Sequence, residues 1–147
     1  METSTSGAPS GTGSGSSLGK EAQAHLPDCS RILLFDAAGS VLFASCAVLP
    51  GEAKQLAACF DDREAAVQSG LRLEGRRYEV HRHHPPLVFG RSMADCEPET
   101  STGIAVCRMD RPSGGAAFIA VTYEQPHTSA RVVPRVQDFA QKHLAAA

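Results

Sequence analysis

Short apolar runs separated by turn-forming residues recur along most of this 147-residue chain and limit the folds that it can adopt. Five of them read RILLF (31–35), VLFAS (41–45), PLVFGR (86–91), GIAVCR (103–108) and AAFIAVTY (116–123). Apolar runs of about four to eight residues, bounded by Gly, Pro and Asp, are typical of β-strands. No run approaches the roughly 20 residues that a membrane-spanning helix needs. The pattern therefore predicts an antiparallel sheet in a chain without a transmembrane segment.

The segment GLRLEGRRYEVHR, residues 70–82, predicts a further hairpin, because apolar residues alternate on both sides of a Glu-Gly turn. If the second strand is regular, one of its faces carries Tyr78, Val80 and Arg82. The segment also holds four arginines, which are Arg72, Arg76, Arg77 and Arg82. So many arginines in a chain of net charge −2 need a physical reason.

Two segments show helical periodicity. Residues 50–60 begin with Pro50, which the first turn of a helix tolerates, and their apolar stripe consists of Ala53, Leu56, Ala57 and Phe60. Residues 129–144 repeat the pattern, with Ser129 available as a cap. Pro134 is unfavourable inside a helix, so we expect this helix to start near residue 131. The elements together predict an α+β fold with about six antiparallel strands, an internal helix and a C-terminal helix.

The chain is long enough for one domain with a proper core. Residues 1–20 contain 14 Ser, Thr or Gly residues, which bury too little apolar surface to offset the entropy lost on ordering. We therefore expect a flexible tail over residues 1–27 and a folded domain over residues 28–147.

Charge and cysteine content exclude several classes of protein. Residues 70–147 hold 10 Lys/Arg and 8 Asp/Glu, an excess too small for a strong nucleic-acid binder. The five cysteines include no C-x-x-C pair, so neither a disulfide framework nor a zinc knuckle is indicated. The N-terminus lacks the features of a signal peptide, and a cytoplasmic protein is expected.

Six segments in this order resemble the profilin family: GSVLFASC (39–46), LPGEAKQLAACF (49–60), GLRLEGRRYEVHR (70–82), FGRS (89–92), GIAVCR (103–108) and VTYEQP (121–126), followed by the terminal helix. The resemblance covers roughly residues 28–144. It implies a central antiparallel sheet with terminal helices on one side and short helices on the other. It further implies a monomeric, cytoskeleton-associated protein that regulates filament assembly by binding the actin monomer, without a cofactor or covalent chemistry.

The resemblance also implies where actin would bind. Arg77, Val80 and Arg82 match the family's binding strand, and Arg91 matches a basic position at the end of the next strand. The last helix would contribute Arg131 and Asp138. A planar guanidinium group on a rigid strand can pair with carboxylates of an acidic partner such as actin. The alternative is that these arginines are solvated charges that keep an edge strand from aggregating.

Several departures from the family pattern indicate a divergent member, similar to the testis-type profilins in which actin and polyproline binding are reduced. Ala130 and Val133 occupy places that are usually Gly and Asn at the actin face, so we expect weakened affinity for actin. The chain has no Trp and its first aromatic residue is Phe35, which argues against proline-rich ligands. The family's N-terminal helix is expected to be missing or shrunken, since only SLGKEAQAHL, residues 17–26, could form one. A second hypothesis is therefore a profilin-fold adaptor or phosphoinositide-binding protein that has lost actin, with the lipid headgroup held by Arg76, Arg77, Arg82 and Arg91. A third, weaker one is a longin- or roadblock-type trafficking scaffold.

The sequence offers residues for a metal site and for a catalytic site, but it favours neither. The HRHH cluster of His81, His83 and His84 could bind zinc together with Cys96, Cys107 or His127, but adjacent residues of a strand point apart. Cys46 with a histidine could act as a nucleophile, yet no catalytic motif surrounds it. We expect neither a metal site nor an enzyme.

Overall fold

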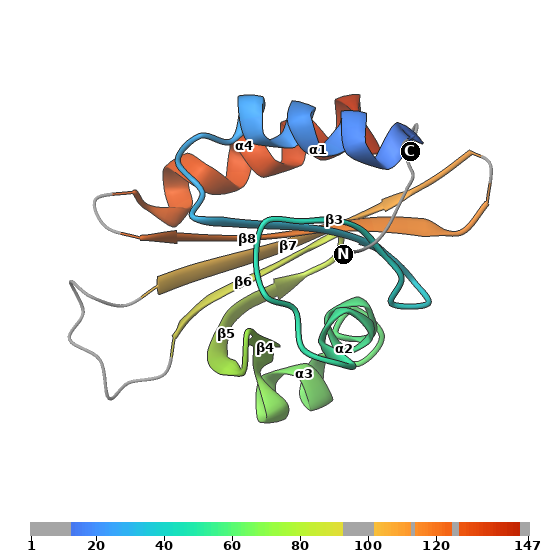
Figure 1. Ribbon diagram of the computed structural model, residues 1–147. Coiled ribbons are helices and arrows are strands. Elements are labelled where there is room, and N and C mark those ends of the chain that lie inside the picture. Colours follow the sequence, from blue (N-terminus) through green and yellow to red (C-terminus); the bar gives the residue numbers. More distant parts are fainter. Residues whose placement is uncertain (1–12, 93–101, 113, 125–126, 145–147) are drawn as a thin grey trace.

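The computed structural model describes residues 13–92, 102–112, 114–124 and 127–144, and its centre is a seven-stranded antiparallel sheet (Figure 1). The strands are β2 (Arg31–Asp36), β3 (Val41–Ala44), β4 (Leu71–Leu73), β5 (Arg76–His84), β6 (Leu87–Ser92), β7 (Thr102–Asp110) and β8 (Ala116–Glu124). The helices are α1 (Gly13–His25), α2 (Glu52–Ala58), α3 (Arg63–Ser69) and α4 (Ser129–Lys142). The strand order is β3-β2-β8-β7-β6-β5-β4. The predicted α+β class is confirmed, and the sheet has seven strands instead of about six; β4 and β5 form the predicted hairpin.

Helices cover both faces of the sheet, and each face has its own apolar core (Figure 1). The core beneath α1 and α4 includes Leu34, Ile119, Val121, Val136 and Phe139. The core beneath α2 and α3 includes Leu33, Phe35, Leu56, Val106 and Phe118. Neighbouring residues of β2, such as Leu33 and Leu34, therefore serve opposite cores, which explains why its run is continuously apolar. None of the helices in the described ranges is long and apolar enough to cross a membrane.

The predicted start of the domain at residue 28 is wrong, because α1 precedes it and packs on the sheet. Leu18, Ala22 and Leu26, at spacings of four, are 9%, 0% and 2% exposed. Gly19 allows the close approach to β3, since a Cβ atom there would lie 2.2 Å from the ring of Phe43. The segment expected to be a tail thus contributes an amphipathic helix to the core.

The last helix begins earlier than its proline suggested. Thr128 is the N-cap residue and Ser129 is the first helical residue, although Pro134 lies inside the helix. Pro134 is exposed, whereas Val132, Val133, Val136, Phe139 and Ala140 are buried. Burial of this stripe offsets the missing backbone donor of the proline.

A buried carboxylate from α2 holds the turn between β4 and β5. Glu74 and Gly75 both have positive φ, 56° and 77°, as a tight two-residue hairpin turn requires. The side chain of Glu52 is 6% exposed and accepts hydrogen bonds from the N–H groups of Leu49, Glu74 and Gly75 at 2.9, 2.8 and 2.7 Å. The hairpin that carries the arginines is therefore fixed to the rest of the fold.

Candidate functional site

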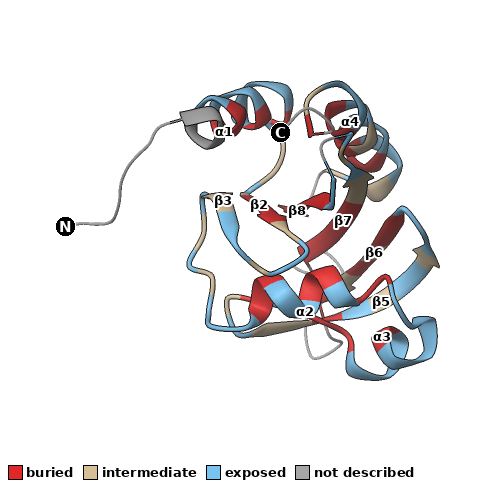
Figure 2. Ribbon diagram, turned by 90° about the vertical axis from the view of Figure 1, so that its right-hand side faces the viewer, coloured by how far each residue is buried: buried red, intermediate tan, exposed pale blue. Residues whose placement is uncertain are grey.

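One part of the sheet face that carries α4 remains open to solvent. α4 packs on β7 and β8, while β5 and β6 extend beyond it (Figure 2). By strand register, the side chains on this open part include Glu79 and Arg82 of β5 and Phe89 and Arg91 of β6. We call these four residues the β5–β6 surface.

A β-bulge decides which residues of β5 join this surface. Val80 pairs with Gly90, but the next paired residue is Arg82, opposite Phe89, so His81 is the extra residue. Val80 packs against the core on the α2 side, whereas Arg82 lies on the α4 side with Phe89. The expectation that Tyr78, Val80 and Arg82 share a face is therefore wrong, and Val80 is not part of the β5–β6 surface.

The bulge depends on a glycine in the neighbouring strand. A Cβ atom on Gly90 would lie 1.7 Å from the carbonyl oxygen of Glu79, a distance that no side chain can accept. Gly90 thus permits the close backbone approach at which β5 changes register. The FGRS segment carries this glycine between the two surface residues of β6.

Arg91 lies beside a tyrosine that joins the sheet to α4. Its guanidinium carbon is 6.0 Å from the ring centroid of Tyr123, and the Tyr123 hydroxyl lies 2.6 Å from Oγ of Ser129 at the start of α4. The ring has room because a Cβ atom on Gly103 would fall 2.3 Å from it. Burial raises the pKa of Tyr123 above its ordinary value of 10.0, so the hydroxyl stays protonated at neutral pH. Ser129 is therefore a tertiary contact of α4 and not its predicted cap.

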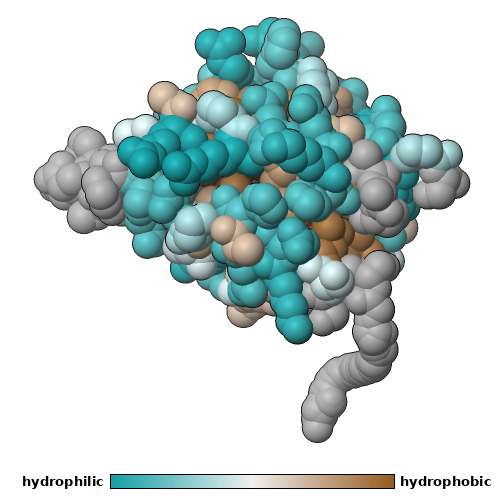
Figure 3. All heavy atoms as spheres, turned by 90° about the horizontal axis from the view of Figure 1, so that it is seen from above, coloured by the Kyte–Doolittle hydropathy of each residue, from teal (hydrophilic) through white to brown (hydrophobic). Residues whose placement is uncertain are grey.

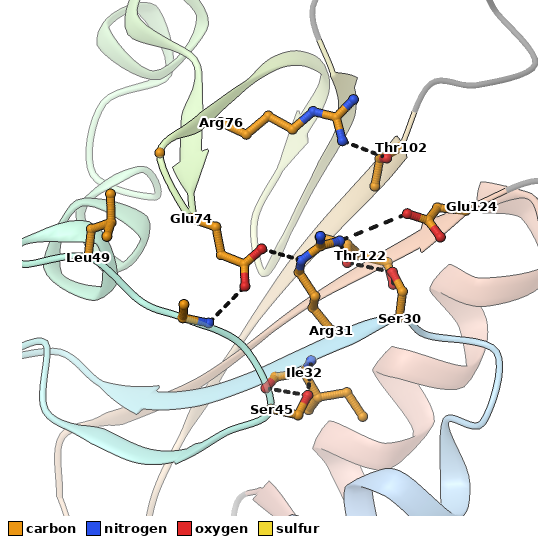
Figure 4. A network of polar contacts seen from close by, with 12 residues as sticks. Ser30, Arg31, Ile32, Ser45, Leu49, Glu74, Arg76, Thr102, Thr122 and Glu124 are labelled. Carbon is orange, nitrogen blue, oxygen red and sulfur yellow. Dashed lines mark hydrogen bonds and ion pairs between the residues drawn. The ribbon is translucent and has the colours of Figure 1, made fainter.

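Two of the predicted binding arginines are occupied by contacts within the protein. Arg77 donates from Nε to the carbonyl of Ser69 at 2.9 Å and from Nη2 to that of Gln68 at 2.7 Å. Arg76 lies over the ring of Tyr78, on the α2 side, and donates to Oγ1 of Thr102 at 3.0 Å (Figure 4). The predicted four-arginine cluster is consequently divided: Arg76 lies on the α2 side and the guanidinium group of Arg77 is bound at the end of α3, which leaves Arg82 and Arg91 on the β5–β6 surface.

A polar network on the α2 side of the sheet accounts for further charges of this hairpin (Figure 4). Nε of Arg31 lies 2.5 Å from Oε1 of Glu74, and the other carboxylate oxygen accepts from the N–H of Ala47 at 2.7 Å. These hydrogen bonds lower the pKa of Glu74 below its ordinary 4.5, the bond from Ala47 having the largest effect. The network is structural, because it ties β2, the β4–β5 turn and the segment after β3 together.

The residues predicted on α4 lie away from the β5–β6 surface. Arg131 and Asp138 share an exposed stripe with Arg135 and Lys142, at spacings of three and four. Arg135 donates to Asp28 at 2.9 Å, which places this stripe toward α1, and Asp138 pairs with Lys142 at 3.2 Å. Val133, expected at the actin face, is 8% exposed and packs in the core.

The sequence did not point to Glu79 and Phe89 as site residues. Glu79 pairs in register with Arg91, and Phe89, which is half-buried, pairs with Arg82. The alternation of β6 could have indicated Phe89, because it lies two residues before Arg91. Viewed from the side of α1 and α4, the molecule shows mostly hydrophilic side chains with smaller apolar areas between them (Figure 3).

The HRHH residues do not converge on a metal. His81 lies 3.3 Å from Glu79, while Nε2 of His83 lies 2.7 Å from the carbonyl oxygen of Cys59 on the α2 side. Cys96, a partner in that hypothesis, lies outside the described residues. Burial raises the pKa of Cys46 and Cys107 to about 11, which disfavours the thiolate that a nucleophile or zinc ligand would need.

Comparison with known proteins identifies the family of this chain. The sequence model of the family described as Profilin matches residues 19–147. The chain belongs to the profilin family. The match begins within α1, in agreement with a domain that starts before residue 28. No significant match was found among curated protein sequences.

Solved profilin structures share this fold at low sequence identity. Acanthamoeba castellanii profilin II is 18% identical, with a TM-score of 0.69 over 88% of this chain and 94% of that one. LokiProfilin1 in complex with rabbit actin is 13% identical, with a TM-score of 0.68 over 93% and 98%. Human profilin II is 18% identical, with a TM-score of 0.56 over 80% and 90%. This profilin is therefore a divergent member with a preserved fold.

Proposed function

We propose that this profilin binds an actin monomer and regulates filament assembly from the cytoplasm, using the β5–β6 surface. The proposal rests on membership of the family, and the LokiProfilin1 and LokiProfilin2 structures are complexes with rabbit actin. The observation that supports this surface is its position: β5 and β6 are left open beside α4, with Arg82 and Arg91 on the same face. Binding would be stoichiometric and would involve no covalent chemistry.

The chemistry of the surface suits an acidic partner with an apolar element. Arg82 is exposed, and among the described residues no hydrogen bond or ion pair to its guanidinium group is found. Phe89 offers apolar area between the two arginines, and a rigid sheet loses little entropy on binding. With Arg76 and Arg77 held by the protein itself and Val133 buried, we propose an affinity for actin below that of a profilin with the full pattern.

Titration against fluorescently labelled actin monomers tests the proposal. Arg82→Glu reverses a charge on the β5–β6 surface and should weaken binding by about tenfold or more, because like charges would then face each other. Arg63→Glu makes the same change on α3, on the other face of the sheet, and should bind as the unmodified protein does. Equal loss in both variants, or no binding of the unmodified protein at tens of micromolar, would contradict the proposal.

Phosphoinositide binding is the second candidate, because the same two arginines could attract an anionic headgroup. It is the weaker one, since Arg76 and Arg77 are committed to Thr102 and to backbone carbonyls. Sedimentation with phosphoinositide-containing vesicles distinguishes the two candidates. If the lipid is the ligand, the unmodified protein should pellet with the vesicles and should not bind actin, and Arg82→Glu should abolish the pelleting. Proline-rich ligands are not part of the proposal, because the described part of α1 contains no Trp, Tyr or Phe.

A further inference from the structure

Two histidines and a glutamate meet where α1 and α4 end. Nε2 of His25 lies 3.4 Å and Nε2 of His143 lies 4.0 Å from the same carboxylate oxygen of Glu21, Oε2. In the described part of the chain, these are the only three His, Cys, Asp or Glu side chains whose possible ligand atoms lie together, all within 4.8 Å. They come from two helices that are more than a hundred residues apart in sequence.

We propose that Glu21, His25 and His143 form a binding site for a divalent transition metal, with Zn²⁺ as the best fit. Zinc takes imidazole nitrogen and carboxylate oxygen at about 2.0–2.2 Å in a tetrahedron, so its ligand atoms lie roughly 3.3 Å apart. The distance from His25 to Glu21, 3.4 Å, is already close to that value, whereas His143, at 4.0 Å, must move closer. Side-chain rotations of these partly exposed residues would bring the two nitrogens together. Water would complete the coordination, because all three side chains reach solvent.

The surroundings favour a cation held in a fixed position. His25 is the last residue of α1 and His143 is the C-cap of α4, and both helix ends carry partial negative charge. The His143 ring stacks on Phe139, with centroids 5.1 Å apart, and the two imidazole rings are 4.8 Å apart. Phe139 is 1% exposed, so one side of the site is an apolar floor that orients the rings.

A bound metal would connect the two helices that cover one face of the sheet. α1 packs mainly on β3 and makes fewer contacts with α4, among them those of these rings. The ion pair of Arg135 with Asp28, three residues after α1, lies beyond the helix end. Metal binding would therefore stabilise the docked position of α1. This inference is independent of the proposed actin site, which lies on β5 and β6.

Competing ligands in the described residues are less suitable. His83 is bonded to a backbone carbonyl, and His81 and His84 flank it on the strand. Burial raises the pKa of Cys29 and Cys59 to about 12, so these thiols are protonated in the metal-free protein, and neither belongs to a group of three possible ligands among the described residues.

Isothermal titration of the full chain, purified without a histidine tag, tests the site with ZnCl₂ and with MgCl₂ as a control. We expect one Zn²⁺ per chain, no Mg²⁺ binding, and a zinc affinity at least tenfold weaker in His25→Ala and in His143→Ala, since even losing an outer partner of a metal ligand costs about 10–100-fold. Glu21→Gln keeps the shape of the side chain and should also weaken binding. His84→Ala removes an exposed histidine of β5 and should leave the affinity unchanged.

Two results would overturn the proposal: an affinity that depends on His84 instead of His25 and His143, or the absence of saturable zinc binding. Nuclear magnetic resonance of the imidazole groups separates loss of a ligand from loss of the fold. The ring signals of His25 and His143 should shift together as zinc is added, up to one equivalent. The amide signals of the sheet should keep the chemical shifts of the folded protein. Zinc should also raise the unfolding temperature of the unmodified protein and not that of a folded His143→Ala variant.

Discussion

At the scale of single residues, the arginines of the β4–β5 hairpin have unlike roles although they are close in sequence. Arg76 donates a hydrogen bond to Thr102 and Arg77 donates to two backbone carbonyl groups. Arg82 follows the β-bulge and therefore lies on the α4 side of the sheet. The sequence showed that arginines cluster in this hairpin, but it did not show which of them bind within the protein and which lie on the open face of the sheet. That division depends on one extra residue, His81, and on Gly90, whose missing side chain admits the carbonyl of Glu79.

Glu74 should make the stability of this hairpin depend on pH. Its pKa is lowered by the hydrogen bonds from Ala47 and Arg31, so its ionised form stabilises the folded state. The contribution is complete well above the ordinary carboxyl pKa of 4.5 and is lost as the pH falls below that value. Glu74→Gln should lower the free energy of unfolding at pH 7 by about 1 kcal/mol, and the difference should shrink at pH 3.

Urea unfolding at the two pH values measures this difference. Asp61→Asn, at an exposed position between α2 and α3, serves as the control and should differ little from the unmodified protein at either pH. A difference for Glu74→Gln that grows on acidification would mean that the network with Arg31 does not stabilise the ionised carboxylate.

At the scale of elements, periodicity predicted the strands, α2 and α4, while α1 was not expected as part of the domain. The strand runs are apolar enough to be recognised, but Gly and Ser dominate the start of α1 and mask its pattern. The signal that remained was Leu18, Ala22 and Leu26, at i, i+4 and i+8. Their burial shows that three residues on one stripe can dock a helix when the sheet beneath it is apolar.

A charged side chain should release α1 from the sheet only if it replaces a residue of the buried stripe Leu18, Ala22 and Leu26. Ala22 is 0% exposed, so Ala22→Asp would bury a carboxylate and should cost about 3 kcal/mol or release the helix. Ala24 lies on the exposed side of α1, and Ala24→Asp is the matched control with little expected effect. Limited proteolysis should show faster cleavage within α1 in Ala22→Asp alone. Urea unfolding of the same variants measures the change in the free energy of unfolding. Equal cleavage of the two variants would show that α1 is not held by this stripe.

At the scale of the whole molecule, the sequence predicted the fold class and the profilin resemblance, and it predicted only part of the site. Strand order and register arise from contacts between distant segments, so no local pattern reveals that α4 covers β7 and β8 but leaves β5 and β6 open. The same limit explains why Val80, Arg131 and Asp138 were grouped with Arg82 and Arg91. Only the folded sheet separates them.

Hydrogen–deuterium exchange of the full chain with and without monomeric actin would locate the contact and distinguish the β5–β6 surface from the opposite face of the sheet. We expect slower exchange in peptides from β5 and β6, around Arg82, Phe89 and Arg91, and unchanged exchange in α2 and α3. Protection confined to α2 and α3, or no change anywhere at saturating actin, would contradict the proposed actin site.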